Sequence, residues 1–220
     1  MKFTKDEIRK SMLLYAVTDR MWLKEGQTLA AVTEEVLQNG ATFLQIREKE
    51  LDHDAFLAEA MELKAVAERY HVPFVVNDDI DIALACDADG VHVGQSDIVG
   101  KDVRAMIGPN KILGISANTV ETALAAQAAG ADYIGVGAVF ATTTKKNAVT
   151  LSVPKLLEIC GAVDIPVVAI GGIGAGNILQ LKGSGVDGVA VVSAIYGQSD
   201  PGAAAADMLV LAKEMVAAHG

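Results

Sequence analysis

Short apolar runs alternate along the chain with longer segments whose apolar residues recur at helical spacing. The first run is LLYAVT (13–18), and the segment after it, QTLAAVTEEVLQNG, is amphipathic and stops at Gly40. The other runs are TFLQIR (42–47), PFVVN (73–77), GVHV (90–93), KILGIS (111–116), YIGVG (133–137), IPVVAIGG (165–172) and GVAVVS (188–193). The pattern predicts eight strands, each followed by a helical segment.

The predicted strands lack the strict alternation of a sheet that has one face in water. Their continuous valine, isoleucine and alanine content indicates strands that are covered on both faces. Strand followed by helix is the order of a parallel sheet, and eight such units predict a single (β/α)8 TIM barrel over residues 1–220. An open, doubly wound sheet is the main alternative. The segment FTKDEIRK predicts a short extra N-terminal helix outside the barrel.

Composition and charge narrow the class of protein. With 51% hydrophobic and 21% charged residues, the chain has the apolar content of a globular domain. The net charge of −10 argues against nucleic acid and anionic membranes as partners, although a local cationic cleft could still bind a small anionic substrate. The early run SMLLYAVTD is too short for a signal peptide or a membrane span. Cys86 and Cys160 form no metal or redox motif, so we expect reduced, buried thiols in a cytoplasmic protein, and a homo-oligomer is left open.

A barrel makes a specific prediction about polar residues, because active sites of this fold lie where the strands end. Polar and glycine residues do gather at those points. They are Gln45, Arg47 and Lys49 after the second strand, Asn77 and Asp78 after the third, Gln95 and Asp97 after the fourth, Ser116 after the fifth, Thr142, Thr143, Thr144 and Lys145 after the sixth, Gly171 and Gly172 after the seventh, and Ser193 after the eighth. The loops GPNK and AGAD, which lead into strands, lack this density.

Three cations and two carboxylates in this set suggest a particular chemistry. Arg47, Lys49 and Lys145 would share one mouth, and Asp78 and Asp97 come from adjacent strands, so that their carboxylates could share one ion. Mg²⁺ takes one or two carboxylates together with phosphate oxygens and waters. The combination therefore predicts a metal–diphosphate site.

Each carboxylate also has a structural interpretation. Asp78 could cap the next helix, although Asp79 or Asp81 could fill that role, and Asp97 could be a solvated loop residue. His92 is a lone strand histidine, which is more typical of a hydrogen-bonded interior group than of a catalyst. The position of both carboxylates on neighbouring strands beside three cations favours the metal.

The glycine-rich stretch GGIGAG (171–176) precedes a helical segment. It follows the seventh strand and does not open a βαβ unit, so a dinucleotide-binding motif is a weak interpretation. In barrels, the loops after strands seven and eight often bind phosphate through backbone N–H groups. We therefore expect Gly172 and Ser193 to hold a monophosphate, a role that is compatible with a tight turn. The mouth is predicted to hold two anions.

Seven stretches then carry a resemblance to a known family. They are LYAVTD (14–19), LQIREK (44–49), VNDDIDIALACDADGVHVGQSD (76–97), ISANT (115–119), ADYIGVGAVFATTTKK (131–146), VVAIGGI (167–173) and VVSAI (191–195). Together they resemble the thiamine phosphate synthase family nearly end to end. That family joins 4-amino-2-methyl-5-(diphosphooxymethyl)pyrimidine to thiazole phosphate, giving thiamine phosphate and pyrophosphate. The resemblance implies a transferase of thiamine biosynthesis with Mg²⁺ as cofactor and two small-molecule substrates.

The resemblance also implies roles for individual residues. The pyrimidine diphosphate would contact Gln45, Ile46, Arg47, Glu48, Lys49, Asn77, Ser116 and Lys145, of which Arg47, Lys49, Ser116 and Lys145 would be catalytic. The thiazole phosphate would contact Thr142, Thr143, Thr144, Gly172, Val192 and Ser193. Asp78 and Asp97 would be the Mg²⁺ ligands. The family commonly has P-T-P-T-K where this chain has ATTTK (141–145), and loss of both prolines predicts a less preorganised loop with unaltered chemistry.

Three alternative functions share parts of this pattern. A thiazole tautomerase-like relative uses the same barrel, but an isomerase that acts on a monophosphate needs no metal–diphosphate clamp. A non-catalytic ligand-binding or regulatory barrel is the alternative from another functional class. A phosphate-handling barrel such as one from tryptophan biosynthesis fits the loops after strands seven and eight but not the string of motifs. Mg²⁺-dependent release of pyrophosphate distinguishes the synthase from the first two.

Overall fold

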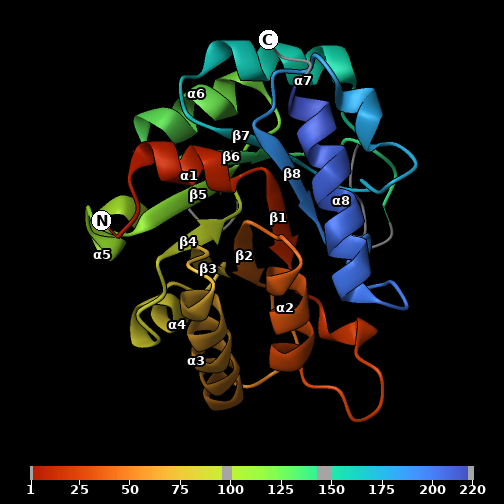
Figure 1. The fold of residues 1–220 in the computed structure, drawn as a ribbon. Coiled ribbons are helices and arrows are strands. Elements are labelled where there is room, and N and C mark those ends of the chain that lie inside the picture. The colour runs from red at the N-terminus through yellow and green to blue at the C-terminus, as the bar shows by residue number, and fades with distance from the viewer. Residues whose placement is uncertain (1, 96–100, 143–149, 218–220) are drawn as a thin grey trace.

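The computed structural model describes residues 2–95, 101–142 and 150–217 (Figure 1). The strands are β1 (Leu14–Val17), β2 (Phe43–Ile46), β3 (Phe74–Asn77), β4 (Gly90–Val93), β5 (Ile112–Ser116), β6 (Tyr133–Val136), β7 (Val167–Ile170) and β8 (Gly188–Val191). The helices are α1 (Lys5–Ser11), η1 (Arg20–Trp22), α2 (Leu29–Gln38), α3 (His53–Arg69), α4 (Ile80–Ala85), α5 (Val103–Ile107), α6 (Val120–Ala128), α7 (Val153–Ala162), η2 (Ile178–Leu181) and α8 (Pro201–Val216). Every predicted strand is present.

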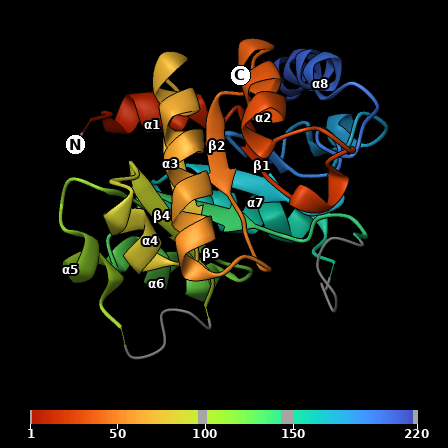
Figure 2. The same cartoon turned by 90° about the horizontal axis from the view of Figure 1, so that it is seen from below.

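The eight strands form one closed parallel sheet. Neighbours pair in chain order from β1 to β8, and β8 pairs with β1, with Tyr15 opposite both Phe43 and Ala190. The predicted (β/α)8 barrel is therefore confirmed, and the open-sheet alternative is wrong. Figure 2 shows α2, α3 and α8 on the outside of the strands, where they cover the outer face of the sheet.

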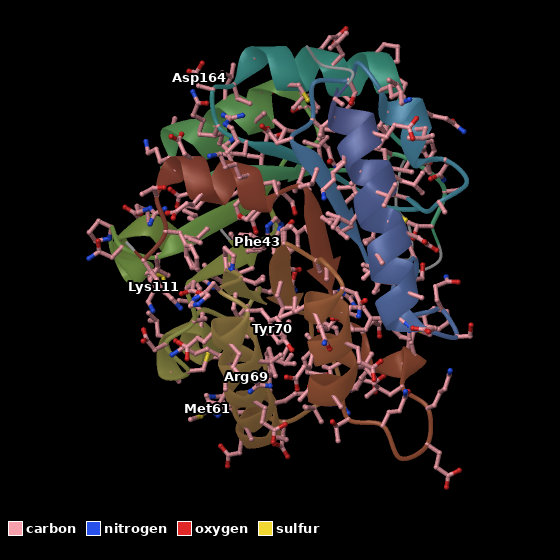
Figure 3. All side chains as sticks on the ribbon, viewed as in Figure 1. Phe43, Met61, Arg69, Tyr70, Lys111 and Asp164 are labelled. Atoms are coloured by element: carbon pink, nitrogen blue, oxygen red, sulfur yellow. The ribbon has the colours of Figure 1, made fainter. Side chains whose placement is uncertain are left out.

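Side chains alternate along each strand between two apolar cores. Leu44 and Ile46 of β2 pack outward in a large cluster with the surrounding helices, whereas Phe43 packs inward with the other inner-facing side chains of the barrel. In Figure 3, Phe43 lies near the middle of the molecule, while Met61 and Arg69 on α3 lie at its outside. Coverage of both faces explains why the strands read as continuous apolar runs.

The end of the barrel at which the strands begin is held by a repeated side-chain bond. A residue just before each even-numbered strand accepts a hydrogen bond from the N–H near the start of the preceding strand. The pairs are Leu14 N to Thr42 Oγ1 at 2.8 Å, Phe74 N to Asp89 Oδ2 at 3.0 Å, Leu113 N to Asp132 Oδ2 at 2.9 Å and Val167 N to Asp187 Oδ2 at 2.8 Å. These four acceptors, called the clasp residues below, bind neighbouring strands together.

Helix α1 crosses this same end of the barrel (Figure 1). Thr4 and Glu7 start the helix with a capping box, and Ile8, which is 1% exposed, packs into the inner core. Arg9 donates to the carboxylate of Asp187 and to the carbonyl of Asp164, both at 2.5 Å. The predicted extra helix is confirmed, and it closes one end of the barrel.

One predicted helix differs in type. The segment NILQLKG forms only the short 3₁₀ turn η2, because Gly183 and Gly185, with φ of +76° and +83°, end the turn at once. No helix in the described parts of the chain has the length and apolarity needed to cross a bilayer.

Candidate active site

The predicted residues of β2 and β3 meet at the end of the barrel where the strands finish. Because β2 and β3 pair in register, the residues that follow them lie side by side. Lys49 Nζ lies 2.7 Å from Asp78 Oδ2, and Asn77 Nδ2 donates to the same oxygen at 2.6 Å. A cleft of about 480 Å³ opens beside this cluster. A cation, an amide and a carboxylate thus share one opening.

Asp78 has an unusual backbone conformation that supports a role in the cleft. Its φ is +64°, a left-handed value that few residues other than glycine adopt, and its N–H donates to the carbonyl of His92 at 2.8 Å. The cap of α4 is Asp79, whose carboxylate accepts from Ile82 N at 2.9 Å. The capping interpretation of Asp78 is therefore wrong, and its carboxylate is engaged with Lys49 and Asn77.

Arg47 is held by its backbone and leaves its guanidinium lightly engaged. Its N–H donates to Thr18 Oγ1 at 3.0 Å, and Thr18 is completely buried. Its guanidinium lies 3.9 Å from Asp19 Oδ2, which is beyond hydrogen-bond distance, and the side chain is 28% exposed. The site therefore presents a cation whose donors can serve an incoming anion.

Glu48 lies between the two cations but points into the protein. Its Oε1 accepts from the next three backbone N–H groups at 2.6, 2.7 and 3.3 Å, and its Oε2 accepts from Arg20 Nε at 2.5 Å. Burial alone would raise the pKa of Glu48, but the N–H donors and Arg20 outweigh it and lower the pKa. The carboxylate therefore fixes the turn that presents Arg47 and Lys49.

Glu48 and Ile46 were both expected to contact substrate. The side chain of Ile46 packs into the outer core, away from the barrel interior, and that of Glu48 is occupied within its own turn. Direct substrate contacts by these two residues stay predictions.

Ser116 and Gln45 belong to a hydrogen-bonded chain inside the barrel. Gln45 Nε2 donates to Tyr15 OH at 2.5 Å, and Tyr15 OH lies 2.8 Å from Tyr133 OH. Tyr133 OH lies 3.0 Å from His92 Nδ1, and His92 Nε2 lies 3.0 Å from Ser116 Oγ. Both ring nitrogens of His92 are engaged, so its predicted interior, hydrogen-bonded role is confirmed.

Two further features fix His92 and Ser116. Burial lowers the pKa of His92 to about 4, against the opposing effect of the Asp78 charge, so that the ring is neutral at pH 7. Gln95 Nε2 donates to the carbonyl of Ser116 at 2.7 Å, which ties the loop after β4 to the end of β5. Ser116 is therefore held through both its side chain and its backbone.

The loops after β7 and β8 form a second part of the same rim. Gly172 has φ of +68°, and a Cβ there would come within 2.3 Å of the Ala141 carbonyl, so only glycine fits. Asn177 orders the glycine-rich turn, because its Nδ2 donates to Gly172 O at 2.8 Å and its Oδ1 accepts from Gly174 N at 2.9 Å. Ser193, in the loop after β8, is exposed.

The remaining predicted residues stand as follows. Val192 packs beside the inner core, and Thr142 is half-buried at the last described position of its loop. Asp97, Thr143, Thr144 and Lys145 lie outside the described residues. Within residues 2–95, 101–142 and 150–217, no three His, Cys, Asp or Glu side chains gather as a metal site.

The sequence reasoning missed several residues that shape this rim. Tyr15 and Tyr133 are inward-facing tyrosines on strands made otherwise of aliphatic residues and glycine, and that contrast was the available signal. Arg20 and Asn177 carry no such signal. Arg20 bonds Glu48 and Asn177 bonds Gly172, and the folded paths of the loops bring these pairs together.

Comparison with known proteins gives a consistent result. A family model described as thiamine monophosphate synthase matches residues 14–195. Two relatives named thiamine-phosphate synthase, from Clostridium tetani and Ruminiclostridium cellulolyticum, are 49% and 51% identical over 187 residues, which is 85% of this chain and 89% of each relative. The solved structure of thiamine phosphate pyrophosphorylase from Pyrococcus furiosus superposes with a TM-score of 0.86 at 37% identity, covering 95% of this chain and 99% of that one.

Proposed function

The chain belongs to the thiamine monophosphate synthase family, and from this membership we propose that it condenses 4-amino-2-methyl-5-(diphosphooxymethyl)pyrimidine with thiazole phosphate. The products are thiamine phosphate and pyrophosphate, so the enzyme is a transferase. The observation that carries the proposal is the cluster of Lys49, Asn77 and Asp78 at the end of β2 and β3, beside the lightly engaged Arg47.

We propose Mg²⁺ as the cofactor, with Asp78 and Asp97 as its ligands. The chemistry at Asp78 fits, because its carboxylate caps no helix and already attracts a cation, the Lys49 ammonium. When bound, Mg²⁺ would neutralise charge on the diphosphate. Lys49 shares Oδ2 of Asp78 with Asn77, and its ammonium would move from that carboxylate to a phosphate oxygen when substrate binds.

The remaining cations would stabilise the leaving group. The carbon–oxygen bond of the pyrimidine diphosphate breaks and its electron pair leaves with the diphosphate, where Arg47, Lys49 and Lys145 would meet the developing charge. The pyrimidine amino group can spread the positive charge on the methylene, which favours a dissociative path. The thiazole nitrogen then forms the carbon–nitrogen bond. That nitrogen has no proton to lose, so no general base is needed.

The thiazole phosphate would occupy the other part of the rim. Thr142, Thr143 and Thr144 would line its side of the mouth, and Gly172, Val192 and Ser193 would form its phosphate cradle. Support comes from the tight glycine turn at Gly172, whose path Asn177 holds by two hydrogen bonds.

We also propose that the protein works in the cytoplasm. Cys86 and Cys160 are both free, as a reducing compartment would keep them, although Cys160 is only half-buried rather than buried as expected.

The decisive experiment is an assay with both substrates and Mg²⁺, with and without EDTA, followed by mass spectrometry of the products. We expect thiamine phosphate only when metal is present. Asp78→Asn should abolish most of the product, whereas Asp81→Asn, the same change at an exposed position in the first turn of α4, should not. Metal-independent product would contradict the Mg²⁺ role. Binding of thiazole phosphate without any product would favour a tautomerase-like or ligand-binding barrel.

A further inference from the structure

A chain of five hydrogen-bonded side chains, here called the interior chain, runs through the inside of the barrel. It begins at Gln45 on β2, continues through Tyr15 on β1, Tyr133 on β6 and His92 on β4, and ends at Ser116 on β5. The rings of Tyr15 and Tyr133 both pack against Phe43, with centroids 4.4 and 5.5 Å from it. Five different strands therefore contribute to one continuous polar path.

The order of protons along this path follows from its first member. The amide nitrogen of Gln45 can only donate, so the Tyr15 oxygen accepts this hydrogen bond. The Tyr15 hydroxyl then donates its own hydrogen bond to the Tyr133 oxygen. Tyr133 then donates to Nδ1 of His92, so that the N–H of the ring lies on Nε2. Nε2–H donates to Ser116 Oγ.

The order leaves Ser116 with a defined role. Its oxygen already accepts from His92, so its own hydroxyl hydrogen is free of the interior chain. We propose that Tyr15, Tyr133 and His92 are positioning residues, which make Ser116 a hydrogen-bond donor toward substrate at the rim. This role rests on the proposed function, in which Ser116 contacts the pyrimidine diphosphate. The reverse order, which needs Gln45 to turn its amide around, would make Ser116 an acceptor instead.

The barrel is built to leave space for the interior chain. A Cβ at Gly114 of β5 would lie 2.4 Å from Tyr133 OH and 2.6 Å from His92 Nδ1, where those two groups meet. A Cβ at Gly135 of β6 would lie 3.1 Å from His92 Cε1. Glycine at position 114 therefore leaves the space that the histidine–tyrosine hydrogen bond occupies, whereas a Cβ at position 135 would require only a small shift of the His92 ring.

Steady-state kinetics of Tyr133→Phe tests the role of the chain. Tyr196→Phe is the matched control, because Tyr196 is also a buried tyrosine whose hydroxyl bonds one side chain, Thr33 Oγ1 at 3.1 Å, but it lies in the outer core. We expect kcat to fall about tenfold in Tyr133→Phe and less than about twofold in Tyr196→Phe. Similar kcat values in the two variants would overturn the proposal. If Tyr133→Phe fails to fold, Tyr15→Phe breaks the chain one bond earlier and replaces it.

A double-mutant cycle separates positioning from a general structural effect. If Tyr133 acts through Ser116, adding Tyr133→Phe to Ser116→Ala should lower kcat by less than about twofold further. A full tenfold loss in the Ser116→Ala background would show that Tyr133 acts by another route, and would overturn the proposal.

Nitrogen NMR of the four histidines tests the proton order without any turnover. We expect Nε2 of His92 to be protonated and Nδ1 to be an unprotonated acceptor, and Tyr133→Phe to perturb the Nδ1 signal. A ring protonated on Nδ1 would overturn the order. This measurement needs no substrate, so it tests the proton order even if the assay above yields no thiamine phosphate. Absence of product would contradict the proposed function but not the proton order.

Discussion

Arg104 and Arg47 lie at opposite ends of the barrel and are used differently. Arg104, at the end where strands begin, donates to the carbonyls of Gly108, Lys111 and Gly130 at 2.7 to 2.9 Å and to Asp132 at 2.7 Å. The Arg47 guanidinium, at the end where strands finish, lies 3.9 Å from a carboxylate. One arginine is saturated by its own protein, whereas the guanidinium of the other makes a single long ionic contact within the described part of the chain.

The carboxylates show the same contrast. Asp132 and Asp187 are clasp residues that each accept a strand N–H and an arginine. Asp78 takes a left-handed backbone and shares one oxygen between Lys49 and Asn77. Polar groups that are saturated within the fold contribute stability, whereas lightly engaged ones such as the Arg47 guanidinium keep binding capacity that the fold does not use. Four substitutions test this division, beginning with the largest expected effect.

Arg47→Ala should damage activity and spare stability. Loss of a preorganised cation at a leaving diphosphate should lower kcat/KM by about a thousandfold. The melting temperature should stay within about 2 °C of the wild type, because the guanidinium makes one long contact with the residues that the structure describes. Kinetics and thermal melting on the same preparation measure both. A marked loss of stability with modest loss of activity would make Arg47 a structural residue and break the comparison.

Arg104→Ala should do the opposite. Three carbonyls and the Asp132 carboxylate would lose their donor, which should lower the free energy of unfolding by about 3 kcal/mol. For a chain of this size the melting temperature should fall by roughly 6–12 °C. The value of kcat below the transition should match the wild type. Arg104→Lys is the control that keeps the charge but loses the forked geometry, and it should recover only part of the stability.

Glu48→Gln should affect stability in a pH-dependent way. We expect a loss of about 2 kcal/mol at pH 7, since an amide oxygen is a weaker acceptor for three N–H groups and Arg20. The folded-state pKa of Glu48 is lowered, so the wild type has this stability above about pH 4.3 and loses it as pH falls through the folded pKa. The difference between the two proteins should therefore shrink on going from pH 7 to pH 4 in urea unfolding.

Glu59 is coupled to Glu48 and also titrates in that test. It shares Arg20 with Glu48, and burial raises its pKa, which is an effect of opposite sign. Because the Glu48 charge also contributes to this raised pKa, Glu48→Gln reduces the effect at Glu59, and the same comparison in a Glu59→Gln background removes it. A pH-independent gap between wild type and Glu48→Gln would mean that the carboxylate charge is not what holds the turn.

Ser184→Ala should have the smallest effect. Ser184 precedes β8 at the saturated end, yet its buried Oγ has no hydrogen-bond partner among the described residues. Removing an unpaired buried hydroxyl should be neutral or should stabilise by up to about 1 kcal/mol in urea unfolding. A clear destabilisation would indicate that the Ser184 hydroxyl has a hydrogen-bond partner, and that the polar groups at this end of the barrel are more fully hydrogen-bonded than described above.

The fold followed from the sequence because its signals are local. Runs such as GVHV and YIGVG are apolar over one strand length, and eight of them separated by helical periods leave few architectures. The 3₁₀ turn η2 was missed because its end depends on two positive-φ glycines rather than on apolar spacing.

Only part of the candidate site could be predicted from the sequence. Polar residues after the strands predicted a shared rim, and Lys49, Asn77 and Asp78 do meet at that end of the barrel. The hydroxyl pair of Tyr15 and Tyr133 joins residues 118 positions apart, which no local pattern encodes. The clasp residues were overlooked for a related reason, since the loop AGAD looks ordinary until Asp132 is seen to bond β5.

Helix α1 covers the end of the barrel where the strands begin, so substrates can approach the candidate site from the opposite end. Ile8 and Met12 pack into the inner core, and Arg9 holds the helix by hydrogen bonds to Asp187 and Asp164 in the loops before β8 and β7. In the proposed reaction, two substrates would bind and two products would leave at the rim where the strands end. If one substrate covers the other at that rim, the covered substrate must bind first, and the product that lies outside must leave before the other.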